Sequence, residues 1–413
     1  MTRSLPFDLR IPSGWDVQPF GRIVERSQEV GRPDARPLSV FLDQGVVPRD
    51  SRDDNFNRLG ADLAKYLVVQ EGDIVFNKLR TWQGGLGVSK FDGIVSPAYF
   101  VCRPHPSADT TFLHYLLRSH VYLEELTRIS KWMPPSQFDI AWDDLRSLPI
   151  LLPPPATQRA IAAFLDREAV RIDALIAAKR RLIQLLALRA LAMLDAWVQE
   201  KIERFGTVPL RRLLSGVEQG WSPECDAVEA EPEEWGVLKT SAVSSGVFRP
   251  EENKRLPPGV LPDLRWAVAD GDLLVIRGSG SKSHVGQTAV AHVRGRRLLL
   301  SDLIYRLRLH RADADFVAAV MRSNFVRGVL EASIRSDAGQ TLKVRGDDLR
   351  VLPIPAVPND QQHASWLEIV RPTSKIAEGV TALESQINVV TELRQALITE
   401  AVSGKLQIPG AES

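Results

Sequence analysis

Two long stretches of the chain carry hydrophobic residues at a spacing of three and four, the pattern of a helix with one apolar face. The first runs from Gln158 to Phe205 without glycine or proline. Its apolar positions follow the 3.5-residue repeat of a coiled-coil seam. They are Ile161, Leu165, Ile172, Leu175, Leu182, Leu186 and Met193. Glu168, Lys179 and Arg189 break this repeat and are interpreted as register markers.

The second stretch lies near the C-terminus and has a cleaner seam. Its positions are Ile376, Val380, Leu383, Ile387, Val390 and Leu397. Pro372 predicts a kink or a restart of this helix, and Gly404 predicts its end. A helix of about 45 residues is a rod of roughly 70 Å. Two rods of similar length, each following a similar segment, most simply pair with each other.

Shorter patterns precede each long helix. Runs such as DIVF (73–76) and DLLVI (272–276) are bounded by turn residues and predict strands. FLHYLLRSHVYLEEL (112–126) and FVAAVMRSNFVRGVL (316–330) have apolar residues at three and four and predict helices. The pattern therefore predicts an α+β fold with a mixed domain in each half.

The two halves repeat each other in order. LRSLPI (145–150) matches LRVLPI (349–354), and both copies continue through prolines to a glutamine, Gln158 or Gln362. Upstream, EGDIVFNKLR (71–80) resembles DGDLLVIRGS (270–279). A period near half the chain predicts two homologous units rather than a solenoid of short repeats.

Composition limits the class of protein. The chain has 413 residues, a formal net charge of +1, 44% hydrophobic residues and two cysteines. These values exclude disordered, collagen-like and disulfide-stapled classes. The N-terminus lacks the apolar core of a secretion signal. Charged residues interrupt the most hydrophobic stretch, Leu182 to Trp197. We expect a cytoplasmic multidomain protein without a membrane span.

Signals for catalysis are weak. RGSGSKS (277–283) has serine where a phosphate-binding P-loop needs glycine before the lysine. Asp226, Glu252 and Lys254 imitate the acidic pair and lysine of a metal-dependent nuclease, and this alternative stays open. The histidines and cysteines do not fall at zinc-binding spacings. We therefore predict no catalytic residue and no metal site on this chain.

Local charge points to a polyanion. Residues 277–311 carry eight lysines and arginines against one aspartate, whereas 224–234 carries six acidic residues and no basic residue. A segregated basic face with polar loops is typical of a nucleic-acid site. The corresponding loop of the first half is also rich in hydrogen-bond donors and has an aromatic residue. Its candidate contacts are Asn77, Lys78, Arg80, Trp82 and Gln83.

At this point the sequence resembles the specificity subunits of type I restriction-modification systems. The resemblance rests on LPILLPPPATQRAIAAFLDREAVRIDALI (148–176), similar to the family's proline-rich entry into a spacer helix. The opening IPSGWDVQPFGRIV (11–24), the repeat start VPLRRLL (208–214) and the close LRQALITEAVSGKL (393–406) also fit. The segment 357–370 keeps Gln362 but departs from the family's polar pattern.

The resemblance implies two target-recognition domains, each reading one half of a split, asymmetric DNA site. They would span 1–152 and 207–356, with spacer helices at 153–206 and 357–413 that pair antiparallel, with pseudo-twofold symmetry, and fix the gap. Implied partners are double-stranded DNA, two methyltransferase subunits with S-adenosylmethionine, and motor-nuclease subunits using ATP and magnesium. We expect none of these cofactors on this chain. A decayed subunit that only assembles is a further alternative.

The family's DNA-facing loops vary, so contact residues are carried over only by position. They are the residues after EGD and DGD and those before LR-x-LPI. Beyond the five named above, the candidates are Lys131, Trp132, Ser136, Gln137, Arg277, Ser279, Lys282, Ser283, His284, Arg335, Ser336, Gln340 and Lys343. The seam residues of the two long helices are the candidate spacer and partner-binding set.

Overall fold

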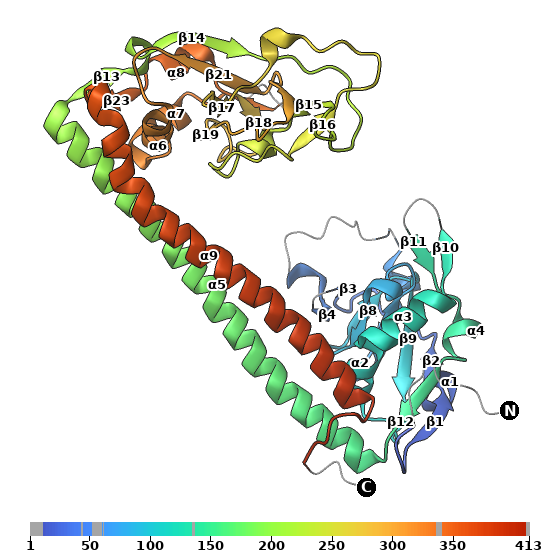
Figure 1. The fold of residues 1–413 in the computed structure, drawn as a ribbon. Coiled ribbons are helices and arrows are strands. Elements are labelled where there is room, and N and C mark those ends of the chain that lie inside the picture. Colours follow the sequence, from blue (N-terminus) through green and yellow to red (C-terminus); the bar gives the residue numbers. More distant parts are fainter. Residues whose placement is uncertain are drawn as a thin grey trace. The chain divides into compact units, whose positions relative to one another are not determined.

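The structure is a computed structural model that describes residues 11–42, 44–51, 60, 62–133, 137–335 and 341–409. The chain divides into two compact units: unit 1 is residues 1–179 and 384–413, and unit 2 is residues 180–383. Each unit combines one mixed domain with half of each long helix (Figure 1). The helix and strand content confirms the predicted α+β class.

Unit 1 is built on a four-stranded antiparallel sheet of order β2-β9-β6-β7. Two-stranded pairs β1-β12, β3-β4, β5-β8 and β10-β11 surround it. The strands are β1 (Asp16–Pro19), β2 (Val24–Ser27), β3 (Leu38–Phe41), β4 (Gly45–Pro48), β5 (Leu67–Val69), β6 (Ile74–Asn77), β7 (Leu86–Val88), β8 (Gly93–Val95), β9 (Tyr99–Pro104), β10 (Lys131–Met133), β11 (Gln137–Asp139) and β12 (Pro149–Leu152). The helices are α1 (Phe20–Ile23), α2 (Thr110–Arg118), α3 (His120–Ile129) and α4 (Trp142–Leu145).

Unit 2 repeats this plan with a four-stranded antiparallel sheet of order β14-β21-β17-β19. Its strands are β13 (Thr207–Pro209), β14 (Leu214–Gln219), β15 (Trp235–Leu238), β16 (Asn253–Arg255), β17 (Leu273–Ile276), β18 (Gly278–Ser279), β19 (Thr288–Val290), β20 (Arg297–Leu299), β21 (Ile304–Leu309), β22 (Leu342–Lys343) and β23 (Pro353–Pro355). Its short helices are α6 (Ala314–Met321), α7 (Asn324–Ala332) and α8 (Gly346–Arg350). Because the order of equivalent strands is the same, the predicted internal repeat is confirmed.

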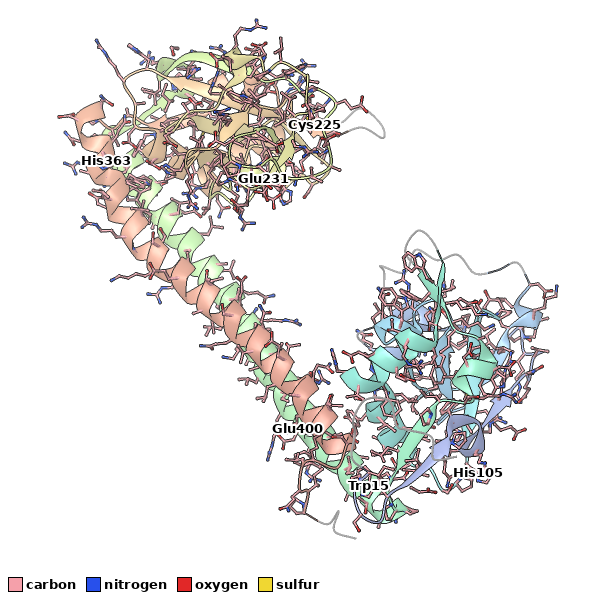
Figure 2. The ribbon with its side chains drawn as sticks, turned by 45° about the vertical axis from the view of Figure 1, so that its right-hand side comes forward. Trp15, His105, Cys225, Glu231, His363 and Glu400 are labelled. Carbon is pink, nitrogen blue, oxygen red and sulfur yellow. The ribbon has the colours of Figure 1, made fainter. Side chains whose placement is uncertain are left out.

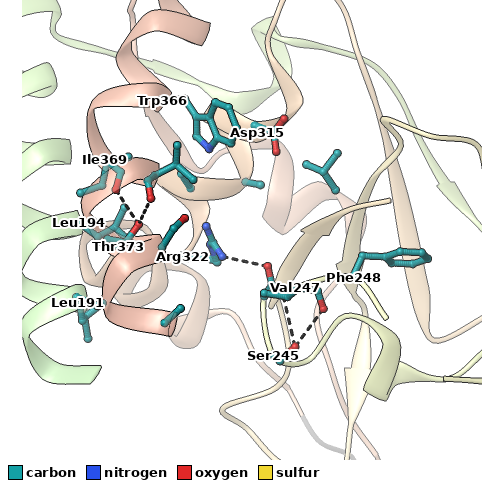
Figure 3. A pocket seen from close by; sticks show the side chains of 18 of the residues that line it. Leu191, Leu194, Ser245, Val247, Phe248, Asp315, Arg322, Trp366, Ile369 and Thr373 are labelled. Carbon is teal, nitrogen blue, oxygen red and sulfur yellow. Dashed lines mark hydrogen bonds between the residues drawn. The ribbon is translucent and has the colours of Figure 1, made fainter. Parts of the chain in front are cut away.

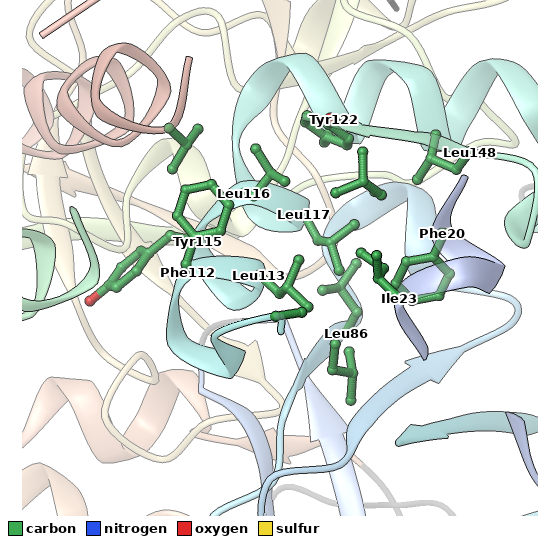
Figure 4. Close-up of a cluster of buried hydrophobic side chains, with 14 of the residues drawn as sticks. Phe20, Ile23, Leu86, Phe112, Leu113, Tyr115, Leu116, Leu117, Tyr122 and Leu148 are labelled. Carbon is green, nitrogen blue, oxygen red and sulfur yellow. The ribbon is translucent and has the colours of Figure 1, made fainter. Parts of the chain in front are cut away.

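Apolar packing joins the long helices to the domains. In unit 1 the α2 side chains Phe112, Leu113 and Leu116 are fully buried against the sheet (Figure 4). The same core takes in Ile161 from the start of α5 (Pro155–Phe205) and Ala401 from the end of α9 (Asn359–Val402). Unit 2 does the reverse, since its core includes Trp197 near the end of α5 and Ile369 near the start of α9. Each domain thus holds one helix by its beginning and the other by its end.

The glutamine of each repeat explains why the motif ends as it does. In unit 1, Gln158 is buried; its Oε1 accepts from the Asp109 N–H at 2.8 Å, and its Nε2 donates to the Pro153 carbonyl at 2.8 Å. In unit 2, Gln362 makes the same pair of bonds with the Asp313 N–H and the Val357 carbonyl. Each glutamine therefore fastens the capped start of α2 or α6 to the start of a long helix.

The long helices run antiparallel within unit 1. Lys179 Nζ on α5 donates to Gln386 Oε1 on α9, while Arg394, further along α9, pairs with Asp173, further back along α5. In unit 2, Lys201 is almost fully buried and bonds Glu368 across the helix pair at 2.7 Å. Lys179, one of the predicted register markers, thus makes a polar contact between the helices.

The seam on α9 matches the prediction, because Ile376, Val380, Leu383, Ile387, Val390 and Leu397 are all half-buried. On α5 the prediction is wrong at two positions: Leu175 and Leu182 are 45% and 44% exposed. Their neighbours Ile176 and Ile183 are half-buried instead. The predicted restart at Pro372 is also wrong, since α9 continues through it.

Helix α5 is long and apolar enough to cross a membrane by length and composition alone. An 18-residue window has mean hydropathy 1.4, and 11% of it is buried. One such helix is weak evidence for a span. The cross-helix contacts of Lys179 and Lys201 show that α5 packs against α9 through polar as well as apolar groups.

At the C-terminal end, α9 stops at Val402, and Gly404 adopts a positive φ of 72°. A Cβ at Gly404 would come within 2.5 Å of Pro12 Cγ and 3.1 Å of the Trp15 ring. Trp15 lies beside this end of α9, where Glu400 is located (Figure 2). Glycine is needed here both for the left-handed turn and for the close approach of the N-terminal segment.

Candidate nucleic-acid interface

In unit 1 the two predicted contact segments meet. Strand β6 ends at Asn77 and the loop after it begins at Lys78. The segment before LR-x-LPI ends at Ile140, whose N–H donates to the Lys78 carbonyl at 3.3 Å. Asn77 is tied down locally, because its Oδ1 accepts from the Leu79 N–H and its carbonyl accepts from the Thr81 hydroxyl. The sequence predicted both segments, and the structure shows that they lie side by side.

An aromatic column links these segments. Trp82, in the loop after β6, lies 5.0 Å from Phe138 on β11 between ring centroids, and Phe138 lies 4.9 Å from Trp132 on β10. The Trp82 indole N–H donates to the Leu79 carbonyl at 3.2 Å. Trp132 is 53% exposed, so the column ends in a supported aromatic ring that faces solvent. The sequence predicted contacts at Trp82 and Trp132 but not at Phe138, because a single phenylalanine in a loop does not by itself indicate a binding residue.

Two cations of unit 1 lie over a different aromatic ring, Phe100. Lys78 Nζ lies 4.6 Å from the Phe100 ring centroid and donates to the Pro97 carbonyl, while Arg26 lies over the same ring at 4.8 Å. Burial, and secondly the charge of Arg26, lower the pKa of Lys78. Arg80, Gln83 and Lys131 are exposed. Ser136 lies outside the described residues, and of Gln137 only the backbone is described.

Unit 2 brings the equivalent segments together by the equivalent bond. The Val344 N–H donates to the Arg277 carbonyl at 2.9 Å, and β18 pairs with β22 through Gly278 opposite Lys343 and Ser279 opposite Leu342. Residues 78 and 277, and likewise 140 and 344, occupy matching positions of the repeat. Two domains of different sequence therefore build the same two-segment surface.

Two hydrogen bonds fix the position of the Arg277 guanidinium. Its Nε donates to the Tyr305 hydroxyl at 3.1 Å and its Nη1 to the Asp302 carbonyl at 3.3 Å. A guanidinium has five N–H donors, so donors remain for a base edge or a phosphate. The half-buried side chain is thus held in one orientation before any ligand arrives.

The remaining candidates of unit 2 belong to the same two segments as Arg277 and Val344. Lys282, Ser283 and His284 lie in an exposed turn after β18, and Ser279 is half-buried. Arg335 is exposed and its backbone pairs with Lys343, which is half-buried. Ser336 and Gln340 lie outside the described residues. Because Gly278 and Ser279 form a strand, the RGSGSKS segment does not form a phosphate-cradling turn into a helix.

The predicted segregation of charge in unit 2 is only partly realised. Arg296 pairs with Glu229, and Arg297 pairs with Glu233. Arg306 is 2% exposed and pairs with Glu218 and Asp272. The acidic run thus neutralises Arg296 and Arg297. Lys282 and Arg335 also have acidic partners, Glu331 at 4.0 Å and Asp348 at 3.7 Å, whereas Arg277 is held by neutral acceptors.

The nuclease trio does not converge. Asp226 pairs with Arg255 at 2.8 Å, whereas Glu252 accepts from the Ser241 hydroxyl and pairs with Lys239. Lys254 is exposed on β16. Within the described ranges, no group of three or more histidine, cysteine, aspartate or glutamate side chains is arranged to hold a metal ion.

The spacer candidates fall into two sets. Ile161 and Leu165 are at most 2% exposed and belong to the unit 1 core, whereas Ile172 and Leu186 are half-buried along α5. A further apolar set faces solvent on the long helices. It consists of Val170, Leu175, Leu182, Leu185 and Leu188 on α5 and Val389 and Leu393 on α9.

Comparisons with known proteins agree with this architecture. No family model matches the chain. The type I restriction enzyme EcoEI specificity subunit of Escherichia coli is 36% identical over 150 residues, which are 35% of this chain and 25% of that protein. The EcoKI specificity subunit of Escherichia coli K12 is 24% identical over 327 residues, 74% of this chain and 68% of that protein.

A solved structure shares the fold. A chain from "Structural basis underlying complex assembly and conformational transition of the type I R-M system" matches with a TM-score of 0.63 and 16% identity, covering 96% of this chain and all of that one. The chain therefore shares its fold, two mixed domains joined by paired helices, with this solved chain. The resemblance predicted from the sequence is confirmed, since the chain is similar in sequence to specificity subunits of type I restriction enzymes. It spans only a quarter of the EcoEI relative.

Proposed function

We propose that this chain is a non-catalytic DNA sequence-specificity subunit of a type I restriction-modification complex. Each unit reads one half of a bipartite, asymmetric DNA site, and the paired helices set the gap between the half-sites. The observation that carries this is the repeated surface: the Ile140–Lys78 and Val344–Arg277 backbone bonds join equivalent segments that carry different side chains.

The chemistry of the two surfaces suits two different half-sites. Unit 1 presents an exposed indole, Trp132, with Lys131 next to it in the chain and Lys78 on the other joined segment. Unit 2 presents Arg277, whose fork of donors matches the guanine edge in the major groove. Two non-identical readers on one chain suit an asymmetric site, whereas a symmetric dimer suits a palindrome.

The partners follow from the same proposal. The solvent-facing leucines of α5, Leu182, Leu185 and Leu188, offer an apolar stripe to helices of methyltransferase subunits. Those subunits would bring S-adenosylmethionine, and motor-nuclease subunits would bring ATP and magnesium. The complex would act on DNA in the cytoplasm.

Mapping of methylated bases by long-read sequencing tests the proposal. Cells would carry the neighbouring methyltransferase with and without this chain. We expect a split motif with a fixed unread gap that appears only with the chain. An unchanged map, with the methyltransferase active beside another specificity subunit, would instead favour an assembly-only adaptor. Magnesium-dependent cutting by the purified chain, lost in Glu252→Ala, would favour the nuclease.

Arg277→Ala refines the test. Loss of a bidentate base contact should relax recognition at one position of one half-site, by about 1–3 kcal/mol. Arg249→Ala is the matched control, because Arg249 is an exposed arginine of unit 2 outside the two contact segments. Equal weakening on every DNA sequence would make Arg277 a phosphate contact instead.

A further inference from the structure

Unit 2 contains a cavity between its domain and the two long helices. It has a volume of about 530 Å³ and lies where α6 and the loop 245–248 face α5 and α9 (Figure 3). Leu191 and Leu194 of α5 and Trp366 and Ile369 of α9 supply apolar walls. Ligand pockets in proteins commonly have volumes of roughly 300–1,000 Å³ and mostly apolar walls with a few polar groups.

The internal repeat explains the cavity. The helices α2 and α6 align as FLHYLLRSH (112–120) and FVAAVMRSN (316–324). His114 and Tyr115 of unit 1 therefore correspond to Ala318 and Ala319 of unit 2, and both alanines line the cavity. Two aromatic side chains in one unit are replaced by two methyl groups in the other.

The contacts of the two aromatic side chains identify the same walls. Tyr115 donates its hydroxyl to Asp166 on α5 at 2.7 Å, and the counterpart of Asp166 is Val370, which lines the cavity. His114 Nδ1 accepts weakly from the Val88 N–H at 3.5 Å, and the counterpart of Val88 is the cavity residue Val290.

The neighbouring loop also corresponds. His114 Cε1 would lie 3.8 Å from a Cβ at Gly45, close to Leu42, whose carbonyl accepts from Arg118 Nη2. In unit 2 the equivalent arginine, Arg322, donates from Nη1 to the Gly246 carbonyl of the cavity loop at 3.1 Å. The space that unit 1 fills with its own aromatic rings is therefore the space left open in unit 2.

One polar group of the cavity is left without a partner. Arg322 Nε is fully buried and has no hydrogen-bond partner among the described residues. Figure 3 shows the Arg322 guanidinium between the α9 residue Thr373 and the loop residue Val247. Burial lowers the pKa of Arg322, and the charge of Asp315 offsets only part of this shift. Asp315 occupies another part of the wall, which disfavours a ligand with more than one negative charge.

We propose that this cavity binds a small aromatic monocarboxylate, with the ring between α5 and α9 in place of the missing aromatic side chains and the carboxylate on Arg322. A carboxylate suits Arg322 because a charge-assisted bond would satisfy the buried Nε. The bound molecule would touch α6 and both long helices, and so would make the contact between this domain and the helix pair more rigid. The inference is independent of the proposed DNA-reading function.

Calorimetric titration of the purified full-length chain tests it, with 2-naphthoate as the probe and 2-naphthamide as the uncharged counterpart. We expect one site per chain and binding at least about tenfold weaker for the amide, because it lacks the charge. Ala319→Tyr restores the side chain of unit 1 and should abolish binding. Arg322→Lys keeps the charge but removes Nε and should weaken binding.

A second cavity-filling variant guards against a folding failure of Ala319→Tyr. Ala377 of α9 lines the cavity and is exposed, so Ala377→Leu should narrow the cavity with little effect on the core. Ala382→Leu is the matched control, because Ala382 is an exposed alanine of α9 outside the lining. Naphthoate binding lost in Ala377→Leu and kept in Ala382→Leu supports the site. Three results would overturn it: no saturable binding up to roughly 5 mM, equal affinity for acid and amide, or undiminished binding by Ala377→Leu.

Discussion

The buried glutamine of unit 2 offers the sharpest test of how the repeat is held together. Gln362 is 2% exposed and bridges the first N–H of the α6 cap at Asp313, at 2.8 Å, and the Val357 carbonyl before α9, at 2.9 Å. Gln362→Met keeps the length and approximate volume of the side chain but removes both bonds. The variant therefore leaves a backbone donor and a backbone acceptor unpaired in a place that water reaches poorly.

The magnitude follows from those two groups. Leaving one buried polar group unsatisfied costs about 1–3 kcal/mol. Allowing for partial relaxation, we expect the free energy of unfolding of unit 2 to fall by about 2–4 kcal/mol. For a unit of this size, each kcal/mol shifts the midpoint by roughly 2–4 °C, so the unit 2 transition should fall by roughly 5–15 °C.

Differential scanning calorimetry of the full chain measures the shift, and hydrogen exchange locates it. Amides at the start of α6 should exchange faster, whereas those at the start of α2, which Gln158 holds in the same way, should not change. Gln361→Met is the matched control, because Gln361 is the exposed neighbour on the same helix. If Gln362→Met melted within about 1 °C of Gln361→Met, with unchanged exchange at α6, the reasoning would be wrong.

Three further predictions follow from other parts of the chain. Trp132→Ala should weaken binding at the unit 1 half-site alone, by about 1–3 kcal/mol if the indole stacks on a base, while Trp132→Phe should retain most of it; competition binding with each half-site scrambled in turn measures this, and equal losses at both half-sites would contradict it. Matched insertions of four residues after Ala178 and in the facing part of α9 should lengthen the gap by about 6 Å, nearly two base-pair steps of roughly 3.4 Å; methylation mapping reads the gap, and an unchanged spacing would mean that the helices do not set it. Burial lowers the pKa of His114 to about 4, whereas the unfolded chain has an ordinary histidine pKa near 6.5. The unfolded chain therefore binds more protons between these two values, and stability should fall as pH drops through that window. Thermal midpoints at about pH 7 and about pH 5 should differ less in His114→Gln than in the unaltered chain, and an identical pH dependence would refute the assignment.

Much of this protein was determined by local pattern. The two long helices follow from short-range periodicity, because a sustained 3.6-residue apolar repeat has few structures open to it. The duplicated domain follows from the internal repeat of the LR-x-LPI segments. The resemblance to specificity subunits rested on the same stretches. The candidate contact segments came from the sequence as well, since polar loops after buried strands stand out; their contact with DNA stays a prediction.

Choices between equivalent neighbours were left to the tertiary structure. Leucine and isoleucine are adjacent at 175–176 and again at 182–183, so a spacing of three or four fits either residue. The packing of α5 against α9 selects Ile176 and Ile183 for the seam and leaves Leu175 and Leu182 on the outside. Periodicity cannot make this distinction, because it depends on where the other helix lies.

Long-range pairing decided the rest. Phe138 between Trp82 and Trp132, the acidic run that neutralises Arg296 and Arg297, and the dispersal of Asp226 and Glu252 are all contacts between segments distant in the chain. The cavity of unit 2 belongs here as well, because Ala318 and Ala319 are unremarkable helix residues until their counterparts His114 and Tyr115 are seen filling the same space. Sequence determines which side chains are available, whereas burial and pairing depend on which segments the fold brings together.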